Sequence, residues 1–173
     1  MENFSNETID TSRLPKFEEV VFTALHPKYL RVVLINVAVF IAVLILAPLL
    51  LSVINPDVFS GRVWVILGFV LPVFYILIIV FSILGFQKKG FAFRDHDVLY
   101  RHGVIATNTI VIPYNRVQHV ALHEGLASRF FGLAKIEIFT AGGSSSDIEI
   151  PGIEKEQAEN IKQLLMGKIQ KTL

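Results

Sequence analysis

Histidines are the first residues of this chain that could do chemistry. His119 and His123 lie four positions apart in a stretch with strand periodicity, so both side chains face the same side. Imidazole is a common ligand of transition metals. Strand residues rise about 3.3 Å each, which puts the two rings roughly 13 Å apart along the backbone, too far to share one ion unaided. We expect surface or packing roles for them, as for His96 and His102, and no metal site.

The serines Ser144 to Ser146 lie beside Asp147 and supply hydroxyl and carboxylate groups that a hydrolase could use. They belong to the glycine- and serine-rich stretch 141–146, which is typical of a flexible loop, and the sequence specifies no base or oxyanion donor for them. Cysteine is absent, which excludes thiol nucleophiles, thiolate metal sites and disulfides. We therefore expect a non-enzymatic protein with no catalytic residue and no cofactor.

Cations offer a third kind of chemistry, the binding of anionic lipid headgroups or acidic protein segments. Lys88, Lys89 and Arg94 follow a long uncharged run, and each cation near an anionic membrane adds roughly 1 kcal/mol of attraction. The same cations also orient a membrane helix, so topology is the competing interpretation. A second set of candidate lipid or partner contacts consists of Arg101, Arg116 and Arg129, joined by Lys135 if folding gathers them on one face; ordinary solvated surface is the alternative.

Composition divides the chain into membrane and soluble parts. Apolar residues make up 53% of the 173 residues and the mean hydropathy is +0.56, too hydrophobic for an ordinary soluble domain. The excess is confined to two blocks. With 16 basic and 15 acidic residues the net charge is +1, which gives no reason to expect a nucleic-acid partner.

Two uncharged runs, Val32 to Pro56 and Val63 to Gln87, are long enough to cross a bilayer as helices, which takes roughly 20 residues. We predict helices at about 32–55 and 63–86 within a transmembrane hairpin at 25–87, because the connection from Asp57 to Arg62 is short. Residues 1–24 are predicted to be a disordered and juxtamembrane segment.

Orientation follows from the cations that flank the two runs. Lys28, Arg31, Lys88 and Lys89 stand at the outer ends, whereas Arg62 alone occupies the connection. The positive-inside bias then places both termini in the cytoplasm.

Residues 88–173 have the alternating pattern of a soluble domain built from short antiparallel strands. An amphipathic helix is predicted at about 154–168, and Pro151-Gly152 is expected to end the last strand. The fold class is therefore a helical hairpin followed by a mainly-β barrel or sandwich with a C-terminal α-helix. Strands are expected at 91–93, 98–101, 108–113, 117–123, 134–140 and 148–150.

An apolar cluster between two glycines consists of Leu126, Phe130, Phe131 and Leu133. We expect it to belong to the core of the barrel; an exposed part of it would indicate an interface.

Three segments after the membrane helices carry a family resemblance: Asp97 to Val104, Val111 to Gln118, and above all Gly125 to Ala134 (GLASRFFGLA). Together they resemble the bacterial pleckstrin-homology (PH) membrane proteins of the YdbS type. The resemblance implies a PH-like barrel with a C-terminal helix, no known catalytic residues, and as partner a larger membrane protein with several copies of the same domain. The first hairpin lacks the dense cation cluster of eukaryotic phosphoinositide-binding relatives, since Arg94 and Arg101 stand beside acidic residues.

Two functions are compatible with these features. The first is a membrane adaptor whose cytoplasmic PH-like domain binds a protein partner or assembles into homo-oligomers, through a strand edge or the rim beside the helices. The alternative is binding or sensing of anionic membrane lipids at the inner membrane surface. A transporter or channel subunit is disfavoured because neither membrane run carries a charged residue.

Overall fold

The computed structural model describes residue 8 and residues 19–56, 61–141 and 148–170. The predictions of disorder up to about residue 17 and of a flexible loop with Ser144 to Ser146 fall almost wholly outside these ranges.

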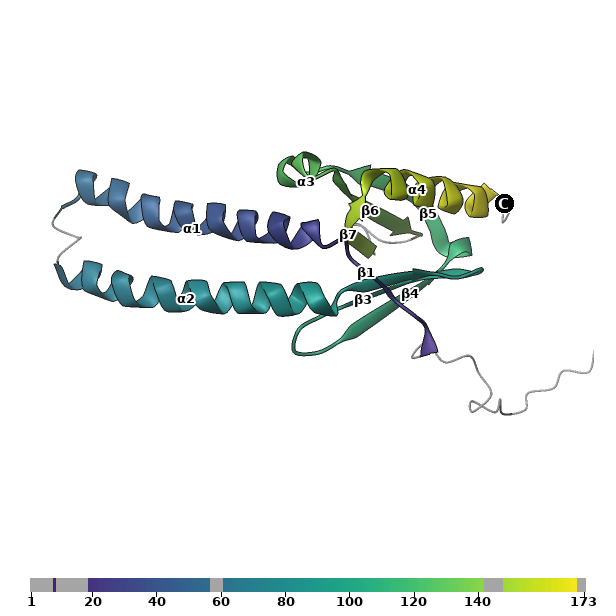
Figure 1. Ribbon diagram of the computed structural model, residues 1–173, viewed down its shortest axis with the longest axis horizontal. Helices are drawn as coiled ribbons and strands as arrows, with labels where there is room; N and C mark the ends of the chain where they lie inside the picture. The colour runs from purple at the N-terminus through teal and green to yellow at the C-terminus, as the bar shows by residue number, and fades with distance from the viewer. Residues whose placement is uncertain (1–7, 9–18, 57–60, 142–147, 171–173) are drawn as a thin grey trace, which may run out of the picture.

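Two long helices, α1 (Lys28–Ile54) and α2 (Gly61–Lys88), form an antiparallel hairpin that extends from one end of a β-rich domain (Figure 1). At 1.5 Å per residue each is roughly 40 Å long, more than the 30 Å of a bilayer's hydrocarbon core. Each helix is somewhat longer than its predicted span because it continues through the cations that flank its uncharged run. Pro48 and Pro72 lie inside helices that continue past them.

The first sheet is antiparallel, with strands in the order of the chain. Its last three strands match the predicted ones, but β1 was not anticipated: this pair of residues from the juxtamembrane segment adds to the edge of β2, with Thr23 opposite Phe91. The N-terminal approach to the membrane is thus part of the domain. The strands are β1 (Thr23–Ala24), β2 (Gly90–Phe93), β3 (Asp97–His102) and β4 (Asn108–Pro113).

The second sheet contains β5 (Val117–His123), β6 (Leu133–Thr140) and β7 (Ile148–Glu154), in that order, and the 3₁₀ turn η3 (Tyr114–Arg116) joins it to the first. The prediction that Pro151-Gly152 ends the last strand is wrong, since β7 runs through both residues. Proline is tolerated here because β7 is an edge strand of its sheet, and Gly152 supplies the positive φ of +67° at this point.

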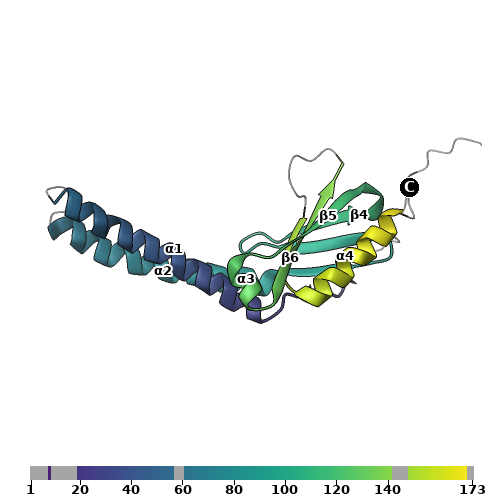
Figure 2. The ribbon, with the colours of Figure 1, turned by 90° about the horizontal axis from the view of Figure 1, so that it is seen from above.

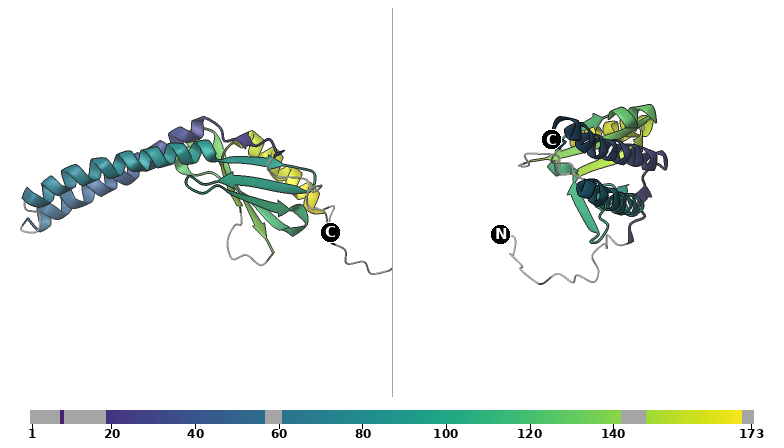
Figure 3. Two further views of the ribbon diagram at one scale, coloured as in Figure 1. Left: turned by 90° about the horizontal axis from the view of Figure 1, so that it is seen from below. Right: turned by 90° about the vertical axis from the view of Figure 1, so that its left-hand side faces the viewer.

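The core lies between the two sheets and is closed by α4 (Lys155–Gln170), as Figures 2 and 3 show. Ile136 and Ile138 on β6 are 0% exposed, as their alternation with Lys135 and Glu137 predicted. Ala158 and Leu165 bury the apolar face of α4 against the same core. The fold class predicted from the sequence, a helical hairpin followed by a PH-like sandwich with a C-terminal helix, is confirmed.

A short helix, α3 (Leu126–Phe130), corrects one expectation about the core. Leu133 is buried as expected, but Leu126 is 92% exposed and Phe130 is 86% exposed. Because a single helical turn has only one inward face, these two side chains are left outside the domain.

Candidate interaction surfaces

The hairpin and the domain are joined without a linker. Only Lys89 separates the end of α2 from the start of β2. The Lys88 side chain at this junction is exposed, whereas Lys89 is half-buried, and burial lowers its pKa. A direct helix-to-strand connection of this kind fixes the direction of the first sheet relative to α2.

The start of α1 is also built into the domain. The backbone N–H of His26 donates to the carbonyl of Gly152, with 2.9 Å between nitrogen and oxygen. The Tyr29 ring lies over Gly152 so closely that a Cβ there would be 2.4 Å from Tyr29 Cγ. Val32, one turn further, is only 2% exposed. Both helices therefore enter the domain as packed elements, at what we call the near end.

The opposite end of the domain, which we call the far end, is closed by polar contacts. Arg94 Nε donates to Asp97 Oδ1 at 2.6 Å, and this pairing raises the Arg94 pKa. The buried Tyr114 hydroxyl donates to the Arg94 carbonyl at 2.7 Å, and burial raises the pKa of Tyr114 to about 12. Lys168 on α4 donates to the Asp95 carbonyl at 3.0 Å. These contacts tie the β2–β3 turn, η3 and the end of α4 together.

Five of the six candidate contact residues lie at one or the other end of the domain. Lys88 and Lys89 lie at the near end, as does Arg101, which is opposite Gly90 in the sheet and stacks its guanidinium 4.3 Å from the centre of the Phe22 ring. Arg94 and Arg116 lie at the far end.

The remaining cations lie on other elements. Arg129 is exposed on α3, and Lys135 on β6 pairs with Glu137 and with Glu149 at 2.9 Å. The single cationic face considered for Arg101, Arg116, Arg129 and Lys135 is therefore not formed.

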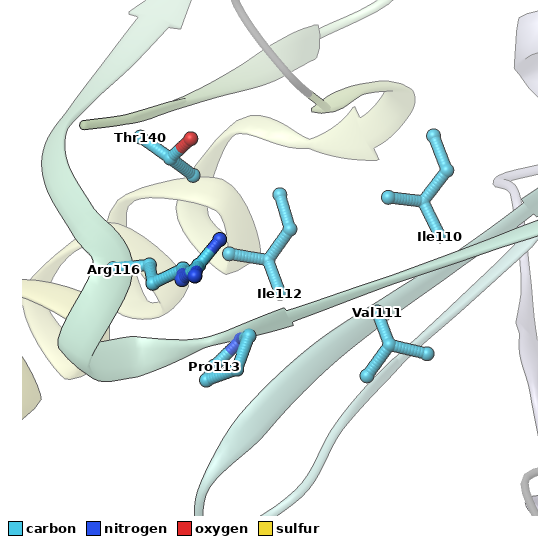
Figure 4. Close-up of a pocket in the computed structure, with 6 residues that line it drawn as sticks. All are labelled: Ile110, Val111, Ile112, Pro113, Arg116 and Thr140. Atoms are coloured by element: carbon cyan, nitrogen blue, oxygen red, sulfur yellow. The ribbon is translucent and has the colours of Figure 1, made fainter. Parts of the chain in front are cut away.

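A pocket of about 440 Å³ opens beside β4 (Figure 4). β4 is the last strand of the first sheet, so its outer edge has no strand beside it among the described residues. The Val111 side chain is 41% exposed, and Arg116 is exposed at the end of the pocket. The lining residues are Ile110, Val111, Ile112, Pro113, Arg116 and Thr140.

The histidines do not form a site in the part of the chain that the structure describes. His119 stacks on Phe139, with 4.1 Å between the ring centroids, and His123 is exposed. No group of three or more potential metal ligands occurs among the described residues.

Comparison with known families decides what this architecture is. The family model "Bacterial PH domain" matches residues 20–169, which includes the end of the juxtamembrane segment and both long helices. The chain belongs to the bacterial PH domain family. It is a membrane protein of this family, since it has two helices long and apolar enough to span a bilayer and the relatives it matches are transmembrane proteins.

Two such relatives come from Bacillus subtilis (strain 168). The chain is 28% identical to the UPF0699 transmembrane protein YdbT over 99 residues, which is 57% of this chain and 20% of YdbT. It is also 28% identical to the UPF0699 transmembrane protein YdbS over 102 residues, 59% of this chain and 58% of YdbS. The match thus spans less than two thirds of either relative, and no solved structure matches the chain.

Three structural features of the candidate surfaces of this bacterial PH domain protein were missed by sequence reasoning. These are the contact of Tyr29 with Gly152, the stacking of Phe22 on Arg101, and the exposed side of α3. The first two join residues far apart in the chain and leave no periodic pattern. The exposed side of α3 could have been predicted, because a short apolar cluster between two glycines cannot bury all of its members.

Proposed function

We propose that this protein is a non-enzymatic membrane adaptor whose bacterial PH domain binds an extended segment of a protein partner along β4. The hairpin holds the domain in one orientation at the cytoplasmic surface of the inner membrane, with both termini in the cytoplasm. The cations that flank the near end support this orientation, because they stand on the domain's side of the hairpin while Arg62 stands on the other.

The observation that carries the proposal is the unprotected edge of β4. Edge strands usually carry charges or proline, which prevent pairing with other chains. The segment 109–112 of β4 reads Thr-Ile-Val-Ile, and proline enters only at its end. Residues 110–113 of β4 line the pocket. A strand added to this edge would gain main-chain hydrogen bonds and place alternate side chains beside Val111.

The nature of the partner follows from the pocket's chemistry and from the family. Arg116 has no ion pair among the described residues, so it can pair with a carboxylate on the incoming strand. We propose an alternately apolar segment with an acidic residue, from a larger membrane protein with domains of the same kind. The match to one fifth of the longer transmembrane protein YdbT supports a partner of that class.

Photocrosslinking in intact cells of the native host tests this proposal. A photoreactive amino acid at Val111 should form an adduct with one dominant membrane protein, identified by mass spectrometry of the tagged full-length chain. The control is the same residue at Leu164, which is 48% exposed on α4, against 41% for Val111, but does not line the pocket beside β4. No adduct at Val111, or equal adducts at both positions, would contradict the proposal.

A second variant separates binding at the edge from accidental proximity. Arg116→Glu should strongly reduce the adduct at Val111, whereas Arg116→Lys should retain most of it because the positive charge remains. If the only adduct is with a second copy of this chain, the result would contradict the adaptor function and indicate a homo-oligomer. Adducts with lipid alone would favour the binding of anionic membrane lipids.

A further inference from the structure

We propose that the near end of the domain inserts apolar side chains into the membrane beside the hairpin, through α3 on one side and the β3–β4 loop on the other. The inserted residues are Ile105, Leu126 and Phe130. This inference goes beyond the adaptor function and does not depend on the β4 edge.

The first observation is the degree of exposure. Ile105 is 93% exposed, Leu126 is 92% and Phe130 is 86%. Apart from Val21 before β1, the other exposed large apolar residues described outside the hairpin, Val111, Leu164 and Met166, are only 41% to 48% exposed. Burial of apolar surface is favourable by about 25 cal/mol for each Å² removed from water. We therefore expect these exposed side chains to contact an apolar environment in the native protein.

The second observation is where these side chains lie along the helices. Figure 1 shows α3 and the β3–β4 loop on opposite sides of the hairpin, both reaching back alongside the helices from the domain. The loop meets α2 at Gly85, where an added Cβ would lie 3.2 Å from Val104 Cγ2. On the other side α3 contacts α1. Val32, the first residue of the uncharged run in α1, is covered at this end and only 2% exposed.

The depth of Gly85 follows from helix geometry. The uncharged run 63–87 is about 37 Å long at 1.5 Å per residue, roughly 7 Å more than the hydrocarbon core. If the excess is shared between both ends, Gly85 lies close to the boundary between acyl chains and headgroups. Ile105, one residue beyond Val104, is then at the same level, where no water-filled compartment would receive it.

The third observation is the charge around the apolar side chains. α3 reads Leu-Ala-Ser-Arg-Phe, so Arg129 stands between Leu126 and Phe130 and carries the helix's one charge. Arg31 and Lys88 are exposed at the same end. Apolar side chains flanked by cations match the boundary layer of an anionic membrane, where acyl chains meet phosphate groups. The chemistry of the ligand is therefore that of a bilayer surface and not of one headgroup in a pocket.

Site-directed spin labelling tests the inference directly, because the chain has no cysteine to remove. Single variants Ile105→Cys, Leu126→Cys and Phe130→Cys of the full-length protein would be labelled and reconstituted in nanodiscs of phosphatidylcholine and phosphatidylglycerol. Met166→Cys, 42% exposed on α4, is the control. The three near-end labels should be more accessible to oxygen and less accessible to a water-soluble nickel complex than the control label.

Two results would overturn the inference. One is nickel accessibility at all three near-end labels equal to that of Met166→Cys. The other is spectral broadening that disappears when labelled protein is diluted with unlabelled protein, because this would place a second copy of the chain on the surface in place of lipid. Apart from the scaffold protein that encloses the lipid, the nanodisc contains no other protein and so no native partner. Failure here therefore leaves the β4 proposal untouched.

Discussion

The two ends of the PH domain are stabilised by different kinds of contact. At the far end, charged and polar groups satisfy one another: Arg94 pairs with Asp97, and Tyr114 and Lys168 donate to the carbonyls of the β2–β3 turn. At the near end, an aromatic ring is packed on a glycine, both helices enter directly, and apolar side chains remain exposed on α3. The polar groups of the far end are paired within the domain, whereas the near end packs on the hairpin and is proposed to contact the membrane around it.

This difference explains how a small domain is held without a linker. The apolar core holds the two sheets and α4 together, and the far-end contacts tie the β2–β3 turn to η3 and the end of α4. The near end can then use its surface for contact with the helices. Between the two ends, β4 is the last strand of its sheet and offers an open edge to the proposed partner.

The largest effect is expected from Gly152→Ala at the near end. The substitution puts a side chain at φ +67° and into the Tyr29 ring, so we expect a loss of about 4 kcal/mol of stability. Thermal unfolding of the purified protein in detergent measures it. Gly132→Ala is the matched control, because Gly132 has φ +69° but open space around its Cα, and should cost only about 1 kcal/mol. Equal losses for both variants would show that the contact with Tyr29 contributes nothing.

The second prediction tests how α4 closes the core. Leu165 is 0% exposed, and Leu165→Ala should destabilise the domain by about 3 kcal/mol through lost burial and a cavity. Its neighbour Leu164 is 48% exposed, and Leu164→Ala should change the unfolding midpoint little. Chemical unfolding followed by far-UV circular dichroism measures both. A large loss for Leu164→Ala would mean that this side of α4 is covered in the native protein.

The third prediction concerns the hydrogen bond at the far end. Tyr114→Phe removes the donor to the Arg94 carbonyl and should cost about 1 kcal/mol. The pH dependence has a definite sign. Because the folded-state pKa of Tyr114 is about 12, above the ordinary value of 10.0, its contribution is complete below pH 10 and is lost as the pH rises towards 12. Between pH 10 and pH 12, the free energy of unfolding should fall less steeply with pH in Tyr114→Phe than in the unsubstituted protein. Identical slopes would contradict the raised pKa of Tyr114.

The smallest effect is expected from Lys135→Met on β6. Its pairs with Glu137 and Glu149 raise the pKa of Lys135, but all three side chains are partly exposed, so the loss should be about 0.5 kcal/mol. The loss should shrink further in high salt. A loss as large as that of Leu165→Ala would mean that charge pairing, and not the apolar core, holds the second sheet together.

The sequence predicted those parts of the molecule in which a periodic pattern determines the structure. Uncharged runs predicted the hairpin, and the alternation around Ile136 and Ile138 predicted β6 and its buried face. Pairing across long separations was invisible, which is why β1 and the contact of Tyr29 with Gly152 were missed. Pro151 was misread because proline ends a central strand but not an edge strand. The candidate cations were found individually, but only the fold shows that Arg94 and Arg116 lie at the end opposite Lys88.

Rigid attachment of the domain to its hairpin can be measured as a distance between the two. Spin labels at Leu84→Cys on α2 and Met166→Cys on α4, both on exposed positions, report it by pulsed electron paramagnetic resonance in nanodiscs. A domain packed on both helices predicts one narrow distance distribution, which broadens when Gly152→Ala is added. A broad distribution without that substitution would contradict the account, because the domain would then move freely on its hairpin.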